Sequence, residues 1–193
     1  MTKRIRIGLP KGKVHGNSKR IIEKSFNFTV PEGKLHVRVD DYDVFFLKHR
    51  DIAELVSEGD LDFGVTSEEW LNELRSDVNI LKKLDWCDTK MALIVKDEFK
   101  EILTCVTEFY NIASNYFKTK GMDHVVIKRI SGSSEALVPT MYDSSIDCVE
   151  TGDTLNANEL FIKEVLFDSS MVIICNKSIN NELINKFNID IDV

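Results

Sequence analysis

The stretch Asp147-Cys148-Val149-Glu150-Thr151-Gly152-Asp153-Thr154-Leu155 joins an apolar run to a small, hydroxyl-bearing turn. Gly152 lets the backbone approach an anion closely and adopt dihedral angles that other residues avoid. Successive N–H groups in such a turn form a concavity that binds anions, and threonine hydroxyls add further donors. The stretch therefore predicts a phosphate cradle. The alternative is a strand–turn–strand segment with a threonine-rich turn, because short motifs match by chance many times.

Two carboxylates belong to the same stretch. Asp147 lies within the apolar run, and Glu150 comes directly before the turn. Carboxylates in this position suit the hydroxyl groups of a sugar, or a Mg²⁺ ion, which prefers oxygen ligands and substrate phosphates. Together with the cradle they indicate a site for a phosphorylated sugar.

Length and composition exclude several classes of protein. The chain has 193 residues and a formal net charge of −7, enough for one large domain or two lobes of about 100 residues each. No apolar run reaches the ~20 residues of a membrane span, and the N-terminus lacks the apolar core of a signal peptide. The acidic balance argues against general affinity for nucleic acids. We therefore expect a cytoplasmic protein with no membrane or nucleic-acid partner.

Two basic turns follow predicted strands. Lys11-Gly12-Lys13 follows the strand 5–10, and Lys48 and Arg50 follow the strand 44–47. Ligands commonly bind at the carboxyl ends of strands in open α/β sheets. An arginine can bind phosphate through two parallel hydrogen bonds. The alternatives are a solvated turn for the lysines and a surface ion pair for Arg50. His49 is interpreted as an exposed turn residue, and neither the histidines nor the four cysteines show metal-ligand spacing.

Strands, glycine-containing turns and helices alternate along the whole chain. This order predicts an α/β fold with mixed, mostly parallel sheets flanked by helices. Because the alternation extends over the whole chain, it suits two lobes with a central cleft, where ligands commonly bind.

Taken together, the motifs resemble those of the short-form ATP phosphoribosyltransferases along nearly the whole chain. The strongest part is 147–158, which is similar to the family's phosphoribosyl-diphosphate motif. The order and spacing of several weaker motifs add specificity: Leu9-Pro10-Lys11-Gly12-Lys13, Arg50-Asp51-Ile52, Gly59, Asp62-Phe63-Gly64-Val65, and Gly132-Ser133 with Glu135.

The resemblance implies a fold like that of type II periplasmic binding proteins. Lobe I, on the ATP and diphosphate side, would take residues 1–87 and 176–193. Lobe II, which binds phosphoribosyl diphosphate, would take residues 88–175. The implied reaction is attack of N1 of ATP on C1 of phosphoribosyl diphosphate, the first step of histidine biosynthesis, with Mg²⁺ accompanying the diphosphate. The implied partners are a histidyl-tRNA-synthetase-like regulatory subunit and a second copy of the chain in a homodimer.

The resemblance also implies roles for individual residues. The 5′-phosphate would be held by Thr151, Gly152 and Thr154, with backbone groups of Asp153 and Leu155. Asp147 and Glu150 would face the ribose hydroxyls, and with Lys11 they form the expected catalytic set. The expected ATP and diphosphate site is Lys11, Gly12, Lys13, Lys48 and Arg50, and no protein-held metal is expected.

Several positions depart from the family pattern, among them Lys13, Ala53, Glu108, Tyr110, Asp153 and Glu159. Two alternatives to the transferase remain open. One, motivated by Glu108 and Asp153, is a non-catalytic paralogue that binds a phosphorylated metabolite. The other is a related phosphoribosyltransferase with another nucleotide acceptor.

Overall fold

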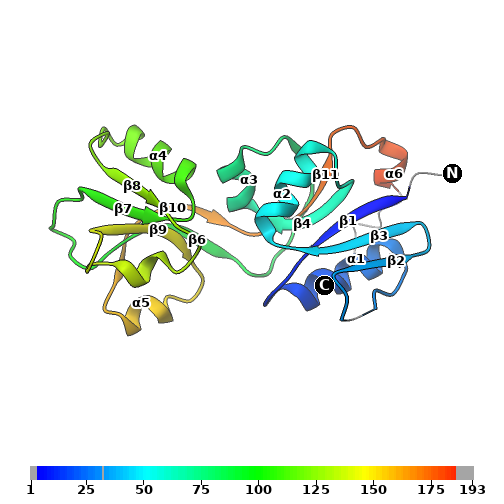
Figure 1. Ribbon diagram of the computed structural model, residues 1–193, viewed down its shortest axis with the longest axis horizontal. Coiled ribbons are helices and arrows are strands. Elements are labelled where there is room, and N and C mark those ends of the chain that lie inside the picture. Colours follow the sequence, from blue (N-terminus) through cyan, green and yellow to red (C-terminus); the bar gives the residue numbers. More distant parts are fainter. Residues whose placement is uncertain (1–3, 32, 186–193) are drawn as a thin grey trace. The chain divides into compact units, whose positions relative to one another are not determined.

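The computed structural model describes residues 4–31 and 33–185, which form two compact units (Figure 1). The first unit comprises Met1–Trp86 and Ser170–Val193, and the second comprises Cys87–Ser169. The predicted lobe I extends over residues 1–3, 32 and 186–193, which lie outside the described residues. Each unit contains one sheet with helices packed on it (Figure 1).

The first unit has a six-stranded sheet in the order β2-β3-β1-β4-β11-β5. Its elements are β1 (Ile5–Pro10), α1 (His15–Phe26), β2 (His36–Val39), β3 (Tyr42–Leu47), α2 (His49–Glu58), β4 (Phe63–Ser67), α3 (Glu68–Leu74), β5 (Val78–Lys83), β11 (Met171–Asn176) and α6 (Asn181–Asn185). β1 runs parallel to both β3 and β4, so the carboxyl ends of these three strands share one edge of the sheet.

The second unit has a five-stranded sheet in the order β10-β6-β9-β7-β8. Its elements are β6 (Thr89–Val95), β7 (Thr104–Thr107), α4 (Tyr110–Thr119), β8 (Val126–Arg129), the 3₁₀ helix η1 (Ser134–Leu137), β9 (Ser144–Val149), α5 (Asp153–Ala157) and β10 (Phe161–Ser169). β7 pairs in parallel with β8 and β9, whereas β6 is antiparallel to β9 and β10. The carboxyl ends of β7, β8 and β9 therefore share an edge.

The α/β architecture with two mixed sheets is as predicted. Parallel pairing is nevertheless confined to the middle of the first sheet and one side of the second. Four strand pairings are parallel and five are antiparallel in the described residues. β11, which the predicted residues 88–175 include in lobe II, pairs instead with β4 and β5 in the first sheet. All six of its residues are buried, because the strand is covered on both faces.

Asp143 stabilises the second sheet at the edge where its parallel strands begin. Its Oδ2 accepts hydrogen bonds from the backbone N–H of Leu103 at 3.1 Å and of Thr104 at 3.0 Å. The Lys100 ammonium lies 2.7 Å from Oδ1. These donors, Lys100 first, lower the pKa of Asp143 to about 2. The carboxylate thereby ties the start of β7 to the start of β9.

We expect this carboxylate to make stability acid-sensitive between pH 4 and pH 2. A lowered folded-state pKa contributes stability above the unfolded pKa, and that stability is lost as the pH falls through the folded pKa. Asp143→Asn should lower the free energy of unfolding by about 1–2 kcal/mol at pH 7, allowing for the exposure of Lys100. Urea unfolding at pH 7, 4 and 2.5 measures this. If Asp143→Asn loses the same free energy of unfolding at all three pH values, the stability does not depend on the protonation of Asp143 and the prediction is wrong.

Across the described ranges, no helix combines the length and the apolar character needed to cross a membrane.

Candidate active site

The predicted phosphate cradle follows β9, an interior strand of the second sheet. β9 ends at Val149, which is paired with Lys90 of β6. The chain then turns through exposed Glu150 and Thr151 to Gly152, whose φ of +81° lies in the left-handed region. Because side chains disfavour this region, glycine suits the turn. The segment continues into α5, so it is strand–turn–helix and not the alternative strand–turn–strand.

Several backbone N–H groups of this turn have no acceptor within the described residues. Asn156 N–H donates to the Gly152 carbonyl at 3.0 Å and begins the helical hydrogen bonds of α5. Within the described residues, the N–H groups of Gly152, Thr154 and Leu155 donate to no protein acceptor. The turn itself is accessible, whereas the Leu155 side chain is 5% exposed and packs in the core of the second unit. Leu155 thus anchors a turn whose amides remain available to an anion.

The side chains of the turn already interact with one another. The Thr151 hydroxyl donates to Asp153 Oδ2 at 2.7 Å. The Asp153 carboxylate therefore lies beside the predicted phosphate position, where it repels an anion. A bound phosphate would compete with Asp153 for the Thr151 hydroxyl.

Asp147 is half-buried and held by two donors. Its Oδ2 accepts from the Ser134 hydroxyl at 2.7 Å, and its Oδ1 accepts from the backbone N–H of Cys148 at 2.8 Å. Burial raises the pKa of Asp147, the hydrogen bonds from Ser134 and Cys148 oppose this rise, and the negative charge of Glu135 adds to it. Ser134 was not among the predicted site residues. Its only sequence signal was membership of a serine-rich turn, which does not reveal a partner 13 residues away.

In the first unit, a pocket of about 360 Å³ lies at the end of β1. Lys11 and Gly12, where φ is +90°, bring the chain out of the sheet, and Lys11 N–H donates to the Leu47 carbonyl at 3.0 Å. The His15 ring packs against the Phe46 ring with centroids 5.0 Å apart. The pocket is lined by Lys11, Gly12, His15, Gly33, Lys34, Leu35 and Phe46. It combines an apolar and aromatic wall with basic side chains.

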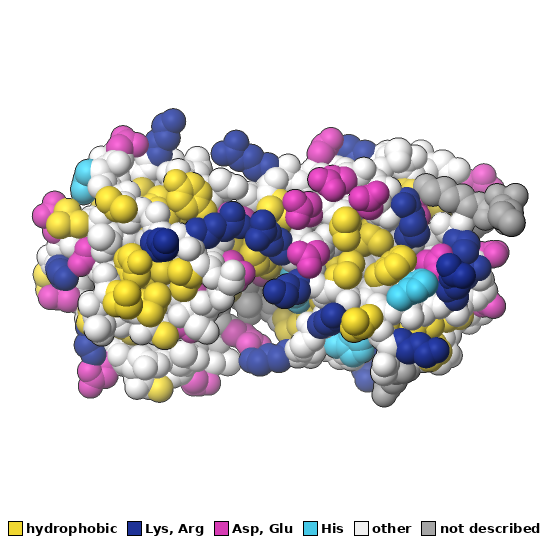
Figure 2. Space-filling model, viewed as in Figure 1, with side chains coloured by type: hydrophobic (Ala, Val, Ile, Leu, Met, Phe, Trp, Pro, Cys, Tyr) yellow, Lys and Arg dark blue, Asp and Glu magenta, His cyan; other side chains and the backbone are white. Residues whose placement is uncertain are grey.

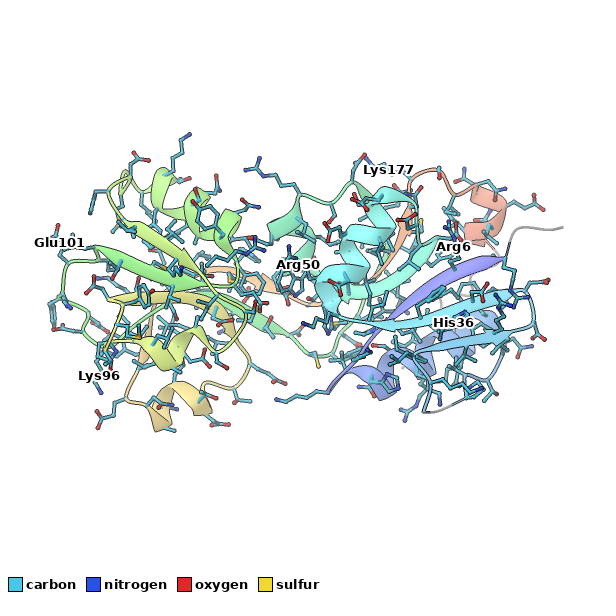
Figure 3. All side chains as sticks on the ribbon, in the orientation of Figure 1. Arg6, His36, Arg50, Lys96, Glu101 and Lys177 are labelled. Atoms are coloured by element: carbon cyan, nitrogen blue, oxygen red, sulfur yellow. The ribbon has the colours of Figure 1, made fainter. Side chains whose placement is uncertain are left out.

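The second basic turn forms the start of α2, with Lys48 as its N-cap (Figure 3 labels Arg50). Arg50 Nε and His49 Nδ1 are buried, and neither has a hydrogen-bond partner in the part of the chain that the structure describes. His49 is not the exposed turn residue that was predicted. Its half-buried position lowers its pKa, against the opposing charge of Glu69. An unpaired arginine N–H at a helix N-terminus is suited to an anionic ligand.

Comparison with known proteins decides the family. Residues 48–192 match the family model described as HisG: ATP phosphoribosyltransferase. The ATP phosphoribosyltransferase of Campylobacter fetus is 31% identical over 179 residues, which cover 89% of this chain and 88% of that protein. This chain belongs to the ATP phosphoribosyltransferase family. Its members are glycosyltransferases, and their reaction is the first step of histidine biosynthesis.

Further relatives agree with this assignment. An ATP phosphoribosyltransferase of Staphylococcus aureus is 32% identical over 160 residues, covering 81% of this chain and 78% of that protein. Among solved structures, the ATP phosphoribosyl transferase (HisG:HisZ) complex from Thermotoga maritima superimposes with a TM-score of 0.81 at 22% identity, covering 89% of this chain and 87% of that one. An arginine-bound form of ArgBP from T. maritima superimposes with a TM-score of 0.57 at 11% identity, covering 96% and 93%. The predicted fold, like that of periplasmic binding proteins, is confirmed.

The structure groups the predicted residues of this ATP phosphoribosyltransferase into local sets. Glu150 to Leu155 form one continuous turn beside Asp147, all in the second unit. In the first unit, Lys11 and Gly12 line the pocket, whereas Lys13, Lys48 and Arg50 are not part of its lining. Sequence reasoning did not select His15, Lys34, Leu35 or Phe46, because residues distant in sequence meet only through the pairing of β1 with β3. On the face drawn in Figure 2, basic and acidic side chains are interspersed on the first unit.

Among the described residues, no three His, Cys, Asp or Glu side chains are grouped so that they could hold a metal ion. Half-buried Asp147 and exposed Glu150 supply carboxylate oxygens, the kind of ligand that Mg²⁺ prefers.

Glu159, which departs from the family pattern, occupies a backbone position suited to glycine. It follows the C-cap of α5 and has φ +52°, a left-handed conformation that glycine adopts without strain. Its side chain is exposed and pairs with Lys96. Exposed ion pairs contribute little to stability.

We therefore expect Glu159→Gly to raise Tm by about 2–4 °C. Glu159→Ala, which loses the ion pair but keeps the strained φ, should not raise it. Thermal unfolding of the three proteins makes the comparison. A higher Tm for the alanine variant than for the glycine variant would show that backbone strain is not the cause.

Proposed function

We propose that this ATP phosphoribosyltransferase binds the 5′-phosphate of phosphoribosyl diphosphate on the turn formed by Glu150 to Leu155. The observation that carries the proposal is the set of N–H groups of Gly152, Thr154 and Leu155, which have no protein acceptor in the described residues and lie on an accessible turn. A dianionic phosphate supplies the strong acceptors that such groups need. Thr154 would add its exposed hydroxyl.

Around this anchor, we assign Asp147 and Glu150 to the ribose hydroxyls. Carboxylates accept hydrogen bonds and stabilise positive charge that develops on the sugar as the diphosphate leaves. The reaction forms a bond between N1 of ATP and C1 of the ribose and breaks the bond from C1 to the diphosphate oxygen. No nucleophile of the protein is needed, so the main contributions are alignment and charge placement.

For ATP and the diphosphate we propose the basic groups of the first unit. The pocket beside Lys11 offers ring contacts through His15 and Phe46 and positive charge through Lys11 and Lys34. The unpartnered Nε of Arg50 favours a phosphate oxygen as its acceptor. Lys13 and Lys48 would add charge nearby. Mg²⁺ would enter as part of the diphosphate substrate and neutralise some of its charge.

We further propose a histidyl-tRNA-synthetase-like regulatory subunit, a homodimer and a cytoplasmic location. Support for the subunit comes from the name of the T. maritima complex, in which the related transferase is paired with HisZ. Size-exclusion chromatography with light scattering, with and without that subunit, measures both assemblies.

The activity test combines the chain with ATP, Mg²⁺ and phosphoribosyl diphosphate, with and without the regulatory subunit. Mass spectrometry should detect phosphoribosyl-ATP and pyrophosphate. Product with another nucleotide but not with ATP would indicate a related transferase. Absence of product in every mixture would contradict the transferase function.

A second candidate, a non-catalytic sensor of a phosphorylated metabolite, is favoured by one observation. Asp153 places a carboxylate beside the cradle and accepts the Thr151 hydroxyl. Calorimetry separates the two functions, because a sensor binds phosphoribosyl diphosphate without forming product. Asp153→Asn should then tighten binding, since it removes the repelling charge.

A further inference from the structure

Ser134 is buried next to the cradle, although it belongs to none of the predicted site motifs. It begins η1, and its exposed fraction is 0%. The chain enters η1 through two left-handed residues, Gly132 with φ +75° and Ser133 with φ +52°. A left-handed serine persists only where its surroundings fix it. The turn before Ser134 is therefore constrained, and burial restricts the Ser134 side chain.

That hydroxyl has a specific acceptor in β9. It donates to Asp147 Oδ2 at 2.7 Å, while Cys148 N–H donates to the other carboxylate oxygen at 2.8 Å. The Ser134 hydroxyl and the Cys148 N–H thus bind different oxygens of the carboxylate. An ionised carboxylate has about four acceptor positions, so further lone pairs remain for a ligand.

We propose that Ser134 is a positioning residue that orients the Asp147 carboxylate toward the vicinal hydroxyls of a bound phosphoribose. The proposal rests on the function proposed above. Ser134 itself touches no substrate. Its hydrogen bond removes the rotational freedom of Asp147 before the sugar binds, and such preorganisation strengthens binding because less entropy is lost.

The experiment measures affinity for phosphoribosyl diphosphate by calorimetry in a double-mutant cycle. Ser134→Ala should weaken binding about tenfold, consistent with losing one hydrogen bond to a charged group, and should leave ATP binding unchanged. In an Asp147→Asn background the same substitution should have much less effect, because an amide no longer offers the same acceptor. Ser134→Cys preserves volume but donates weakly, so it should resemble Ser134→Ala.

Ser145→Ala is the matched control. Ser145 is also a buried serine of the same unit, and its Oγ has no hydrogen-bond partner among the described residues. Its removal should leave affinity unchanged. Thermal unfolding of every variant checks that the fold is retained.

Two results would overturn the proposal. One is wild-type affinity in both Ser134 variants, and the other is an equal loss from Ser134→Ala in the wild-type and Asp147→Asn backgrounds. If the wild type does not bind phosphoribosyl diphosphate, the proposed function fails. In that case ¹³C NMR of the Asp147 carboxyl still tests the hydrogen bond between Ser134 and Asp147 directly. Ser134→Ala should then raise the pKa of Asp147, because it removes a donor to the charged form. An unchanged pKa would refute the orienting hydrogen bond.

Discussion

Gly152→Val is expected to weaken binding of phosphoribosyl diphosphate by about 10- to 100-fold, the loss of one or two hydrogen bonds to a charged group. Gly152 has φ +81°, which a β-branched residue strongly disfavours. A Cβ at this position would meet no atom within 4 Å, so the effect would come from backbone strain and from a side chain covering the open turn. Valine should therefore move the N–H groups that converge on the 5′-phosphate. Thr154→Ala, which removes only a hydroxyl, should weaken binding less, by about tenfold.

Gly121→Val provides a matched control. Gly121 lies in the same unit and has φ +69°, and a Cβ there would also meet no atom within 4 Å, but it follows α4 instead of β9. Gly121→Val should lose about as much stability as Gly152→Val, but it should bind phosphoribosyl diphosphate as tightly as the wild type. Calorimetry with phosphoribosyl diphosphate measures both variants. Wild-type affinity in Gly152→Val would remove the main support for the cradle.

Gly64→Ala is expected to lower the free energy of unfolding by about 1–3 kcal/mol, the range for overpacking a well-packed core. Gly64 lies in β4 beneath α2, and a Cβ there would lie 2.5 Å from Ile52 Cγ2 and 3.1 Å from Val56 Cγ2. Ile52 and Val56 are both fully buried, so neither side chain has space to move away. The helix would have to shift from the sheet, and α2 carries Arg50 in its first turn.

Urea unfolding measures this loss, with Gly16→Ala as the control. Gly16 lies in the first turn of α1 with no atom within 4 Å of its Cβ position, so alanine should be neutral or slightly stabilising. Ile52→Ala combined with Gly64→Ala should cost less than the sum of the single variants, because the smaller side chain removes the clash. Strict additivity would show that the close approach of α2 is not the cause.

The α/β class and the family could be predicted from the amino-acid sequence, and so could the glycine turn on which we propose the cradle. These follow from local patterns: Gly152 marks a turn that needs unusual dihedral angles, and the apolar run before it marks a buried strand. The sequence did not predict α5, because five residues carry too little periodicity to distinguish a helix from a strand. Nor did it place β11 in the first sheet, since an apolar strand does not reveal its pairing partners.

Contacts between side chains that are distant in sequence depend on the tertiary structure. The donation from Ser134 to Asp147 depends on η1 packing beside β9, and the pocket wall of His15 and Phe46 depends on the register of β1 with β3. The close contact of Gly64 with Ile52 likewise depends on how α2 lies on the sheet. Local sequence sets backbone preferences over a few residues. Contacts across tens of residues are selected by burial and hydrogen bonding of the whole fold, which no local pattern encodes.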